Sequence, residues 1–227
     1  MNRLSVARED YLRAISKLDE EGGAVTVTAL AGHIGVRPPS VTGMVRRLVA
    51  DGLVEHTPRA GVRLTARGES MALSVHRRHR LVETFLVEAL GLDWSEVHEE
   101  AEALEHHLSE RVVAAIDDYL GHPRVDPHGH PIPNARGEVI ARRLCPLAEL
   151  VPGEDAVIRE VRSDDPERIR WWKERGLVPG ARVHVAEMSP LDGLWRLTLA
   201  RPDAGAGERG ELVVGAQGLG GLHVERL

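Results

Sequence analysis

Residues 28–53 read TALAGHIGVRPPSVTGMVRRLVADGL and describe two short helices joined by a tight turn. Gly35 breaks the first helix, and Pro38 and Pro39 suit the first turn of the second. The second helix keeps its apolar residues on one side until the Asp-Gly pair at 51–52 ends it. This order of elements predicts a helix-turn-helix.

The flanking segments extend this motif to a winged helix. Residues 5–21, SVAREDYLRAISKLDEE, carry apolar residues at helical spacing, and a glycine pair follows. Residues 53–68, LVEHTPRAGVRLTARG, contain two short strand-like runs around a Pro-Arg-Ala-Gly turn. We expect this hairpin to form the wing of a winged-helix domain over residues 1–65.

The charge pattern of this segment favours DNA binding. The whole chain has a formal charge of −6, which argues against a generally basic surface, yet residues 37–67 hold six arginines against Asp51 and Glu55. Residues at the start of the second helix are expected to meet base edges: Arg37, Pro39, Ser40, Thr42 and Gly43. Cationic residues later in the helix and in the hairpin are expected to contact phosphates: Arg46, Arg47, Arg59 and Arg63.

Composition limits the remaining classes of protein. The chain has 227 residues, of which 42% are hydrophobic but only 3% aromatic, so aliphatic residues must build the cores. No run approaches the ~20 apolar residues of a membrane span, and the first residues lack a signal-peptide core. A single cysteine, Cys145, fits a reducing compartment and excludes a metal site built on thiolate clusters. We therefore expect a cytoplasmic protein without membrane contact.

Three further regions follow the winged helix. Residues 66–121 are helical and carry more apolar residues than they can bury alone, which predicts a dimerisation domain. Residues 122–152 are rich in proline and glycine and read as a linker, in which His122, His128 and His130 are expected to line turns. Residues 153–227 alternate in strand-length runs with one helix inserted, which predicts a small SH3-like β-barrel packed around Trp171 and Trp172.

Residues 98–110, HEEAEALEHHLSE, carry five glutamates and three histidines. On a continuous helix, His98, Glu102, Glu105 and His106 fall within one arc of about 100° beside an apolar stripe. Such groups repel one another unless a cation lies among them. His79 and Glu83, one turn apart on the preceding helix, support a metal site, whereas a surface ion pair is the alternative for that pair alone.

Enzyme motifs are missing from the sequence. Residues 98–102 read HEEAE, so the second histidine of a zincin helix is absent. No paired Glu-x-x-His motif of a di-iron protein, no nucleophile elbow and no phosphate-binding loop occurs. We expect a protein without enzymatic activity.

The order of domains, together with RRHRLVETFL, VHEEAEALEHHLSE and DPHGHPIP, resembles the diphtheria toxin repressor family of metal-dependent transcriptional regulators. The resemblance implies a mainly α fold with a small β part: a winged helix, a helical dimerisation domain and a C-terminal SH3-like (FeoA-like) barrel. It implies a primary metal site at Asp10, Glu102, Glu105 and His106. It also implies an ancillary site at His79, Glu83 and His98, closed by a barrel residue, with Asp165 as the first candidate and Asp164 and Glu167 next.

Departures from the family pattern indicate the metal. Iron-type members carry Met and Cys where this chain has Asp10 and Glu102, and a site rich in oxygen suits Mn(II). Arg13 stands where short manganese regulators have a further carboxylate, which favours one primary ion over a close pair. Fe(II) or another divalent transition metal is the alternative cofactor.

The resemblance implies a homodimer that binds a palindromic operator, with one or two dimers per operator, and represses metal-uptake genes. In this reading Mn(II) fixes the spacing of the two recognition helices to half-sites ~34 Å apart. The alternatives are an iron-dependent regulator of the same family, a winged-helix regulator that senses a non-metal ligand, and a metal-buffering protein.

Overall fold

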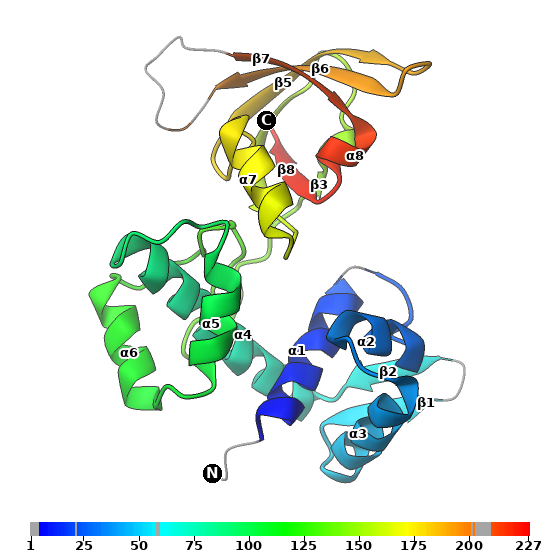
Figure 1. Cartoon of the computed structure of the whole chain (residues 1–227), viewed down its shortest axis with the longest axis vertical. Coiled ribbons are helices and arrows are strands. Elements are labelled where there is room, and N and C mark those ends of the chain that lie inside the picture. The colour runs from blue at the N-terminus through cyan, green and yellow to red at the C-terminus, as the bar shows by residue number, and fades with distance from the viewer. Residues whose placement is uncertain (1–4, 21, 58–59, 201, 203–209) are drawn as a thin grey trace. The chain divides into compact units, whose positions relative to one another are not determined.

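The computed structural model describes residues 5–20, 22–57, 60–200, 202 and 210–227. The chain forms two compact units (Figure 1). The first holds residues 1–79, 105–108 and 133–138, and the second holds 80–104, 109–132 and 139–227. The boundary at residue 79 falls within one long helix, so that helix contributes to both units.

The first unit contains the predicted winged helix. Its elements are α1 (Val6–Glu20), α2 (Val27–Ile34), α3 (Pro38–Ala50), β1 (Val54–Thr57) and β2 (Gly61–Leu64). Thr26 caps α2 by accepting a hydrogen bond from the Ala29 amide, and Gly35 ends α2 in the left-handed conformation with φ 73°. β1 and β2 pair in antiparallel register as the hairpin of the wing.

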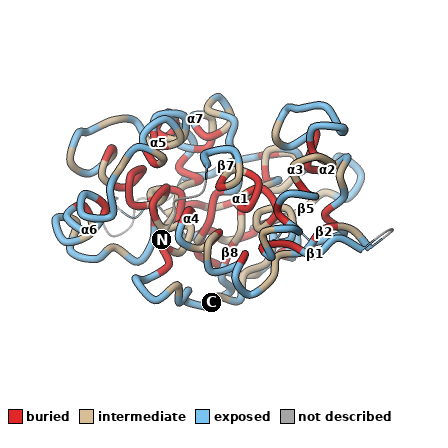
Figure 2. Tube along the Cα trace, turned by 90° about the horizontal axis from the view of Figure 1, so that it is seen from below, coloured by how far each residue is buried: buried red, intermediate tan, exposed pale blue. Residues whose placement is uncertain are grey.

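One apolar core holds these elements together. Leu12, Leu30 and Leu48, from α1, α2 and α3, are all fully buried. In Figure 2 the buried face of α1 is visible as red segments. The wing joins this core because the Val62 amide donates to the Val25 carbonyl at 2.9 Å, just before α2 begins. The α3 helix is thereby held with one face buried and the opposite face exposed.

Three helices follow: α4 (Ala66–Glu88), α5 (Val97–Glu105) and α6 (Glu110–Tyr119). Thr65 ties the start of α4 to the wing, since its hydroxyl donates to the Gly52 carbonyl and accepts from the Gly68 amide. The α5 helix ends at Glu105, and Ser109 caps α6 as a separate helix by accepting from Val112. The prediction of one continuous helix through residues 98–110 was therefore wrong.

The last part of the chain is a six-stranded antiparallel sheet in the order β3-β8-β4-β5-β6-β7. The strands are β3 (Cys145–Pro146), β4 (Asp155–Val161), β5 (Arg182–Ser189), β6 (Leu194–Ala200), β7 (Gly210–Gly215) and β8 (Leu222–Arg226). A 3-10 turn (Leu147–Glu149), α7 (Pro166–Glu174) and α8 (Ala216–Leu219) complete it. Trp172 is fully buried in the core and Trp171 packs against it, so both tryptophans have the predicted packing role.

The segment predicted as a linker is more ordered than its composition indicated. The buried Asp126 carboxylate accepts from the amides of His128 and His130, and the Val161 amide of β4 donates to the His128 carbonyl. A side chain at Gly129 would place its Cβ 1.9 Å from the Arg159 carbonyl oxygen, so only glycine fits this approach. None of the helices in the described part of the chain combines the length and apolar character needed to span a bilayer.

Candidate metal centre and DNA-binding surface

The first unit brings together three of the four residues predicted for the primary site. Asp10 lies in the second turn of α1, Glu105 is the last residue of α5, and His106 follows it. The His106 Nε2 atom lies 3.0 Å from Asp10 Oδ1 and 3.1 Å from Glu105 Oε1. One ligand atom from each residue lies within 4.8 Å of the others, which is the arrangement that one ion needs.

Glu9 contributes to this group and was not predicted. Its side chain is buried beside His106, whose Nδ1 atom lies 2.9 Å from Glu9 Oε2. The same oxygen accepts a hydrogen bond from Arg78 Nη1 at 3.2 Å. The His106 ring is therefore held between Glu9 on one side and two carboxylates on the other.

Arg13 and His79 approach the same buried glutamate. Glu105 is fully buried, with Arg13 Nη1 3.2 Å from its Oε1 atom and His79 Nδ1 2.9 Å from its Oε2 atom. Arg13 Nη1 also lies 3.0 Å from His79 Nδ1. A guanidinium thus lies directly against the Glu105 carboxylate, and the number of primary ions stays a prediction.

The donor set fits a divalent cation. Glu9, Asp10 and Glu105 converge on one imidazole, and a buried carboxylate is costly unless cations or hydrogen bonds compensate it. Arg78 and Arg13 compensate part of this charge. A lone pair on His106 Nε2 would face two carboxylate oxygens at about 3 Å, so a cation at this position would relieve the repulsion. Two oxygens and one nitrogen form a hard, sulfur-free ligand set.

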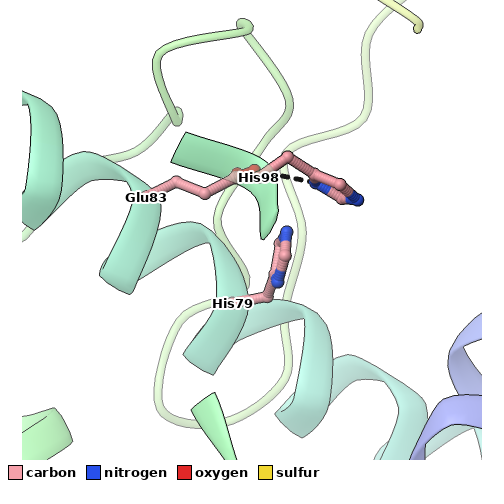
Figure 3. Close-up of side chains that lie close together, drawn as sticks. All are labelled: His79, Glu83 and His98. Carbon is pink, nitrogen blue, oxygen red and sulfur yellow. Dashed lines mark hydrogen bonds and ion pairs between the residues drawn. The ribbon is translucent and has the colours of Figure 1, made fainter. Parts of the chain in front are cut away.

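A second group of candidate ligands lies on α4 and α5. Ligand atoms of His79, Glu83 and His98 lie within 4.8 Å of one another. Glu83 Oε1 is 3.1 Å from His98 Nδ1. Figure 3 shows the rings of both histidines turned toward the same space beside the Glu83 carboxylate. The structure thus brings together the three residues predicted for the ancillary site.

The structure places another of the barrel candidates, Asp164, near this group. Asp164 Oδ1 lies 3.9 Å from His98 Nε2, whereas Asp165 caps α7 by accepting from the Glu167 amide at 3.0 Å. Asp164, which the sequence had ranked behind Asp165, thus lies near this group, and the ligand role of either residue stays a prediction. Both are acidic residues before the same helix, so only the fold distinguishes them.

Glu102 is the predicted primary residue that the structure places differently. Its Oε1 atom lies 3.5 Å from His98 Nε2, next to the second group. The helical wheel had put His98, Glu102, Glu105 and His106 together. In the structure the set divides: His98 contacts Glu83 and Glu102, while His106 contacts Glu105 and Asp10 of α1.

The linker histidines make specific contacts. His128 is buried, with Nε2 2.9 Å from the Trp94 carbonyl oxygen and Nδ1 3.9 Å from Glu83 Oε2. His130 Nδ1 lies 3.1 Å from Asp126 Oδ2. The exposed His122 has a positive φ of 59° and lies 2.9 Å from Asp117. His128 lies in a turn, as predicted, whereas His122 lies at a bend and His130 follows the turn.

The residues predicted to meet DNA lie on α3, on the wing and in the turn before α3. Arg37, Pro39, Ser40, Arg46, Arg47 and Arg63 are exposed, while Thr42 and Gly43 are half-buried. Thr42 donates its hydroxyl hydrogen to the Pro38 carbonyl at 3.1 Å. Arg59 lies outside the described residues. The exposed arginines form a cationic surface suited to phosphate contacts.

A winged helix with buried ligand groups where α1 meets the end of α5 defines a metal-responsive DNA-binding protein. Comparison with protein families agrees. Residues 3–62 match "Iron dependent repressor, N-terminal DNA binding domain", residues 65–134 match "Iron dependent repressor, metal binding and dimerisation domain", and residues 145–202 match the FeoA domain. The chain belongs to the iron-dependent repressor family, and it is a metal-dependent DNA-binding transcriptional repressor rather than an enzyme.

The names of similar proteins include both an iron-dependent and a manganese-dependent repressor. The chain is 37% identical over 202 residues to the iron-dependent repressor IdeR of Mycobacterium leprae, covering 84% of this chain and 87% of the relative. It is 40% identical over 108 residues to the transcriptional regulator MntR of Escherichia coli, and this match covers 48% of this chain and 69% of the relative. A solved manganese-dependent transcriptional repressor in complex with manganese superposes with a TM-score of 0.88 at 34% identity, covering 97% of this chain and 100% of that one.

Metal binding at the second group is expected to depend on pH through His98. Burial acts to lower the pKa of His98, but hydrogen bonds with Glu102 and Glu83 and the charges of Glu83 and Asp164 raise it to about 9. At pH 7 the ring therefore holds a proton that a metal must displace. The apparent affinity should rise about tenfold per pH unit from pH 7 and level off above 9. Titration of the second ion by calorimetry at several pH values measures this, and an affinity independent of pH would contradict it.

Proposed function

We propose that the protein is a manganese-dependent repressor of metal-uptake genes that binds a palindromic operator as a homodimer. The observation that carries the proposal is the approach of Asp10, Glu105 and His106 without a sulfur ligand. Mn(II) accepts carboxylate and imidazole ligands readily, whereas thiolate and thioether ligands favour softer ions. Cys145, the single cysteine of the chain, belongs to β3 of the barrel and not to this group of ligands.

The chain's own residues link metal binding to the DNA-binding helix. Asp10 belongs to α1, whose buried face packs in the core that also holds α3. Glu105 and His106 belong to the segment between α5 and α6. A bound cation supplies the positive charge that lets Asp10 and Glu105 remain close. In this account their shared ligation holds α1 against the 105–108 segment and so selects the DNA-binding state.

The second group of ligands supports an ancillary role. His79 contributes to both places, because its Nδ1 contacts Glu105 while its ring also belongs to the group with Glu83 and His98. With Asp164 as the fourth ligand, this site would join α4 and α5 to the segment before α7. We propose that it stabilises the active form and that the primary site decides metal choice.

Exposed apolar residues on α6 support the homodimer. Val113 and Ile116 are buried, yet Val112 is 43% and Tyr119 is 70% exposed in the single chain. Side chains of this kind normally gain stability by packing against a partner. A second copy of the chain would cover them and place two recognition helices on one operator.

The metal ranking tests the manganese assignment. Duplexes would be selected from random DNA by the protein with Mn(II), and their binding measured anaerobically with Mn(II) and with Fe(II). We expect activation by Mn(II) and loss of binding with a chelator. The variant Asp10→Met should raise the Mn(II) concentration for half-activation at least about tenfold more than that of Fe(II), because a thioether is a poor ligand for Mn(II).

Two outcomes would count against this proposal in different ways. The iron-dependent alternative would be favoured if Asp10→Met left unchanged the ratio of the Mn(II) and Fe(II) concentrations needed for half-activation. DNA binding that persists with a chelator would point to a regulator that senses a non-metal ligand. The control Asp19→Met alters an exposed acid of the same helix and should leave the ratio as it is.

A further inference from the structure

We infer that Glu9 is a positioning residue of the primary metal centre, which fixes the ring nitrogen that His106 offers to the metal. This inference rests on the proposed function, since it assigns a role beside the ligands of that site. Glu9 does not belong to the group of ligand atoms formed by Asp10, Glu105 and His106. Its carboxylate contacts the opposite edge of the imidazole ring.

The contact determines the tautomer of His106. An ionised carboxylate can only accept hydrogen bonds, so the 2.9 Å contact between Glu9 Oε2 and His106 Nδ1 requires the hydrogen on Nδ1. The Nε2 atom is then the ring nitrogen left to bind a metal, and it faces Asp10 and Glu105 at 3.0 and 3.1 Å. Histidine ligands of metals commonly donate their second N–H to a carboxylate, which fixes the ring and makes the ligand more basic.

Burial makes this arrangement rigid. Glu9 is 6% exposed, and Arg78 beside it is 5% exposed. Arg78 donates to the same Oε2 atom at 3.2 Å and so compensates the buried charge. The position of Glu9 in the first turn of α1 also favours an anion there. The contact with Arg78 therefore holds the Glu9 carboxylate against the Nδ1 edge of the His106 ring.

Glu9 and Asp10 are adjacent on α1 but have different roles at the His106 ring. Successive residues on a helix point about 100° apart. Glu9 consequently lies on the Nδ1 side of the ring with a side chain that is 7% exposed, while Asp10 lies on the Nε2 side and is 36% exposed. The more accessible acid is suited to bind an ion, and the buried acid is suited to hold the ligand.

An ion pair that only joins α1 to α4 is the competing explanation. Two variants separate the two roles. Glu9→Gln keeps a hydrogen-bond acceptor but removes the charge, whereas Glu9→Leu combined with Arg78→Met removes the pair together and avoids a lone buried charge. Glu20→Gln changes an exposed acid at the end of the same helix and serves as the control.

Mn(II) affinity of the full-length protein would be measured by electron paramagnetic resonance, with thermal unfolding recorded for every variant. Loss of an outer contact to a metal ligand typically weakens binding by about 10–100-fold. We expect a loss within that range for the double variant, a smaller loss for Glu9→Gln, and none for Glu20→Gln. Unfolding temperatures close to that of the unchanged protein should accompany these losses.

Nitrogen NMR of the His106 ring gives a readout that a purely structural ion pair would not change. We expect hydrogen on Nδ1 in the metal-free protein and coordination through Nε2 with diamagnetic Cd(II), with this preference lost in the double variant. Unchanged affinity in both variants, or coordination through Nδ1 in the unchanged protein, would overturn the inference. Failure of the unchanged protein to bind Mn(II) at Asp10, Glu105 and His106 would instead overturn the proposed function.

Discussion

Replacing Glu105 with glutamine is expected to abolish metal-activated DNA binding. Glu105 is fully buried and lies within 3.2 Å of Arg13, His79 and His106, so no other side chain can take its place without rearrangement. Because losing an outer contact already weakens metal binding by about 10–100-fold, loss of this ligand should exceed 100-fold in Mn(II) affinity. Calorimetric titration with Mn(II) and DNA binding with and without Mn(II) measure the two effects.

The same substitution has a cost in stability that must be measured beside it. Glutamine leaves Arg13 with less compensating charge, and breaking a buried ion pair costs about 3–5 kcal/mol. The Arg13 side chain is 16% exposed, so water reduces this cost. Glu100→Gln, on the exposed face of α5, is the matched control and should change neither quantity. Wild-type activation in Glu105→Gln would show that the group around His106 does not control DNA binding.

Reversing the charge of Arg46 and Arg47 is expected to remove DNA binding while leaving metal binding intact. Both residues are exposed near the end of α3, and neither belongs to the apolar core. Placing two glutamates against phosphates costs several kcal/mol, which corresponds to at least about a 100-fold loss of affinity. Mn(II) titrations of Arg46→Glu/Arg47→Glu should match those of the unchanged protein.

The salt dependence of the DNA affinity shows whether Arg46 and Arg47 contact phosphates. Changing both arginines to glutamine should reduce the slope of log affinity against log salt by about 2, since each phosphate contact contributes roughly 0.9. Arg182→Gln alters an exposed arginine of β5 in the barrel and serves as the control. An unchanged slope after both α3 substitutions would place the phosphate contacts elsewhere on the chain.

Periodicity predicted the helices and most of the barrel strands because their signals are local. The apolar spacing and glycine stops of α1 to α3 and the alternation in β4 to β7 agree with the structure. β8 (Leu222–Arg226) was not predicted, since LHVER alternates over only five residues with two apolar positions, Leu222 and Val224. The sheet also begins at Cys145, inside the segment that composition marked as a linker.

The candidate site could be predicted only in part, because several of its contacts join residues that are distant in the sequence. The helical wheel placed His98 and His106 in one group, but the structure divides them between two groups whose other members come from α1 and α4. Glu9 resembled an ordinary acid of a first helical turn, and its burial depends on Arg78, which is 69 residues away in the chain. The choice between Asp164 and Asp165 likewise depends on which carboxylate caps α7.

The most direct test of the central claim is an anomalous difference map at the manganese absorption edge, from crystals of the full-length protein grown with Mn(II). The account predicts a peak bonded to Asp10, Glu105 and His106, with the His106 ring bound through Nε2. Mn(II)-loaded crystals that show no peak there, with Asp10 and His106 apart, would contradict it.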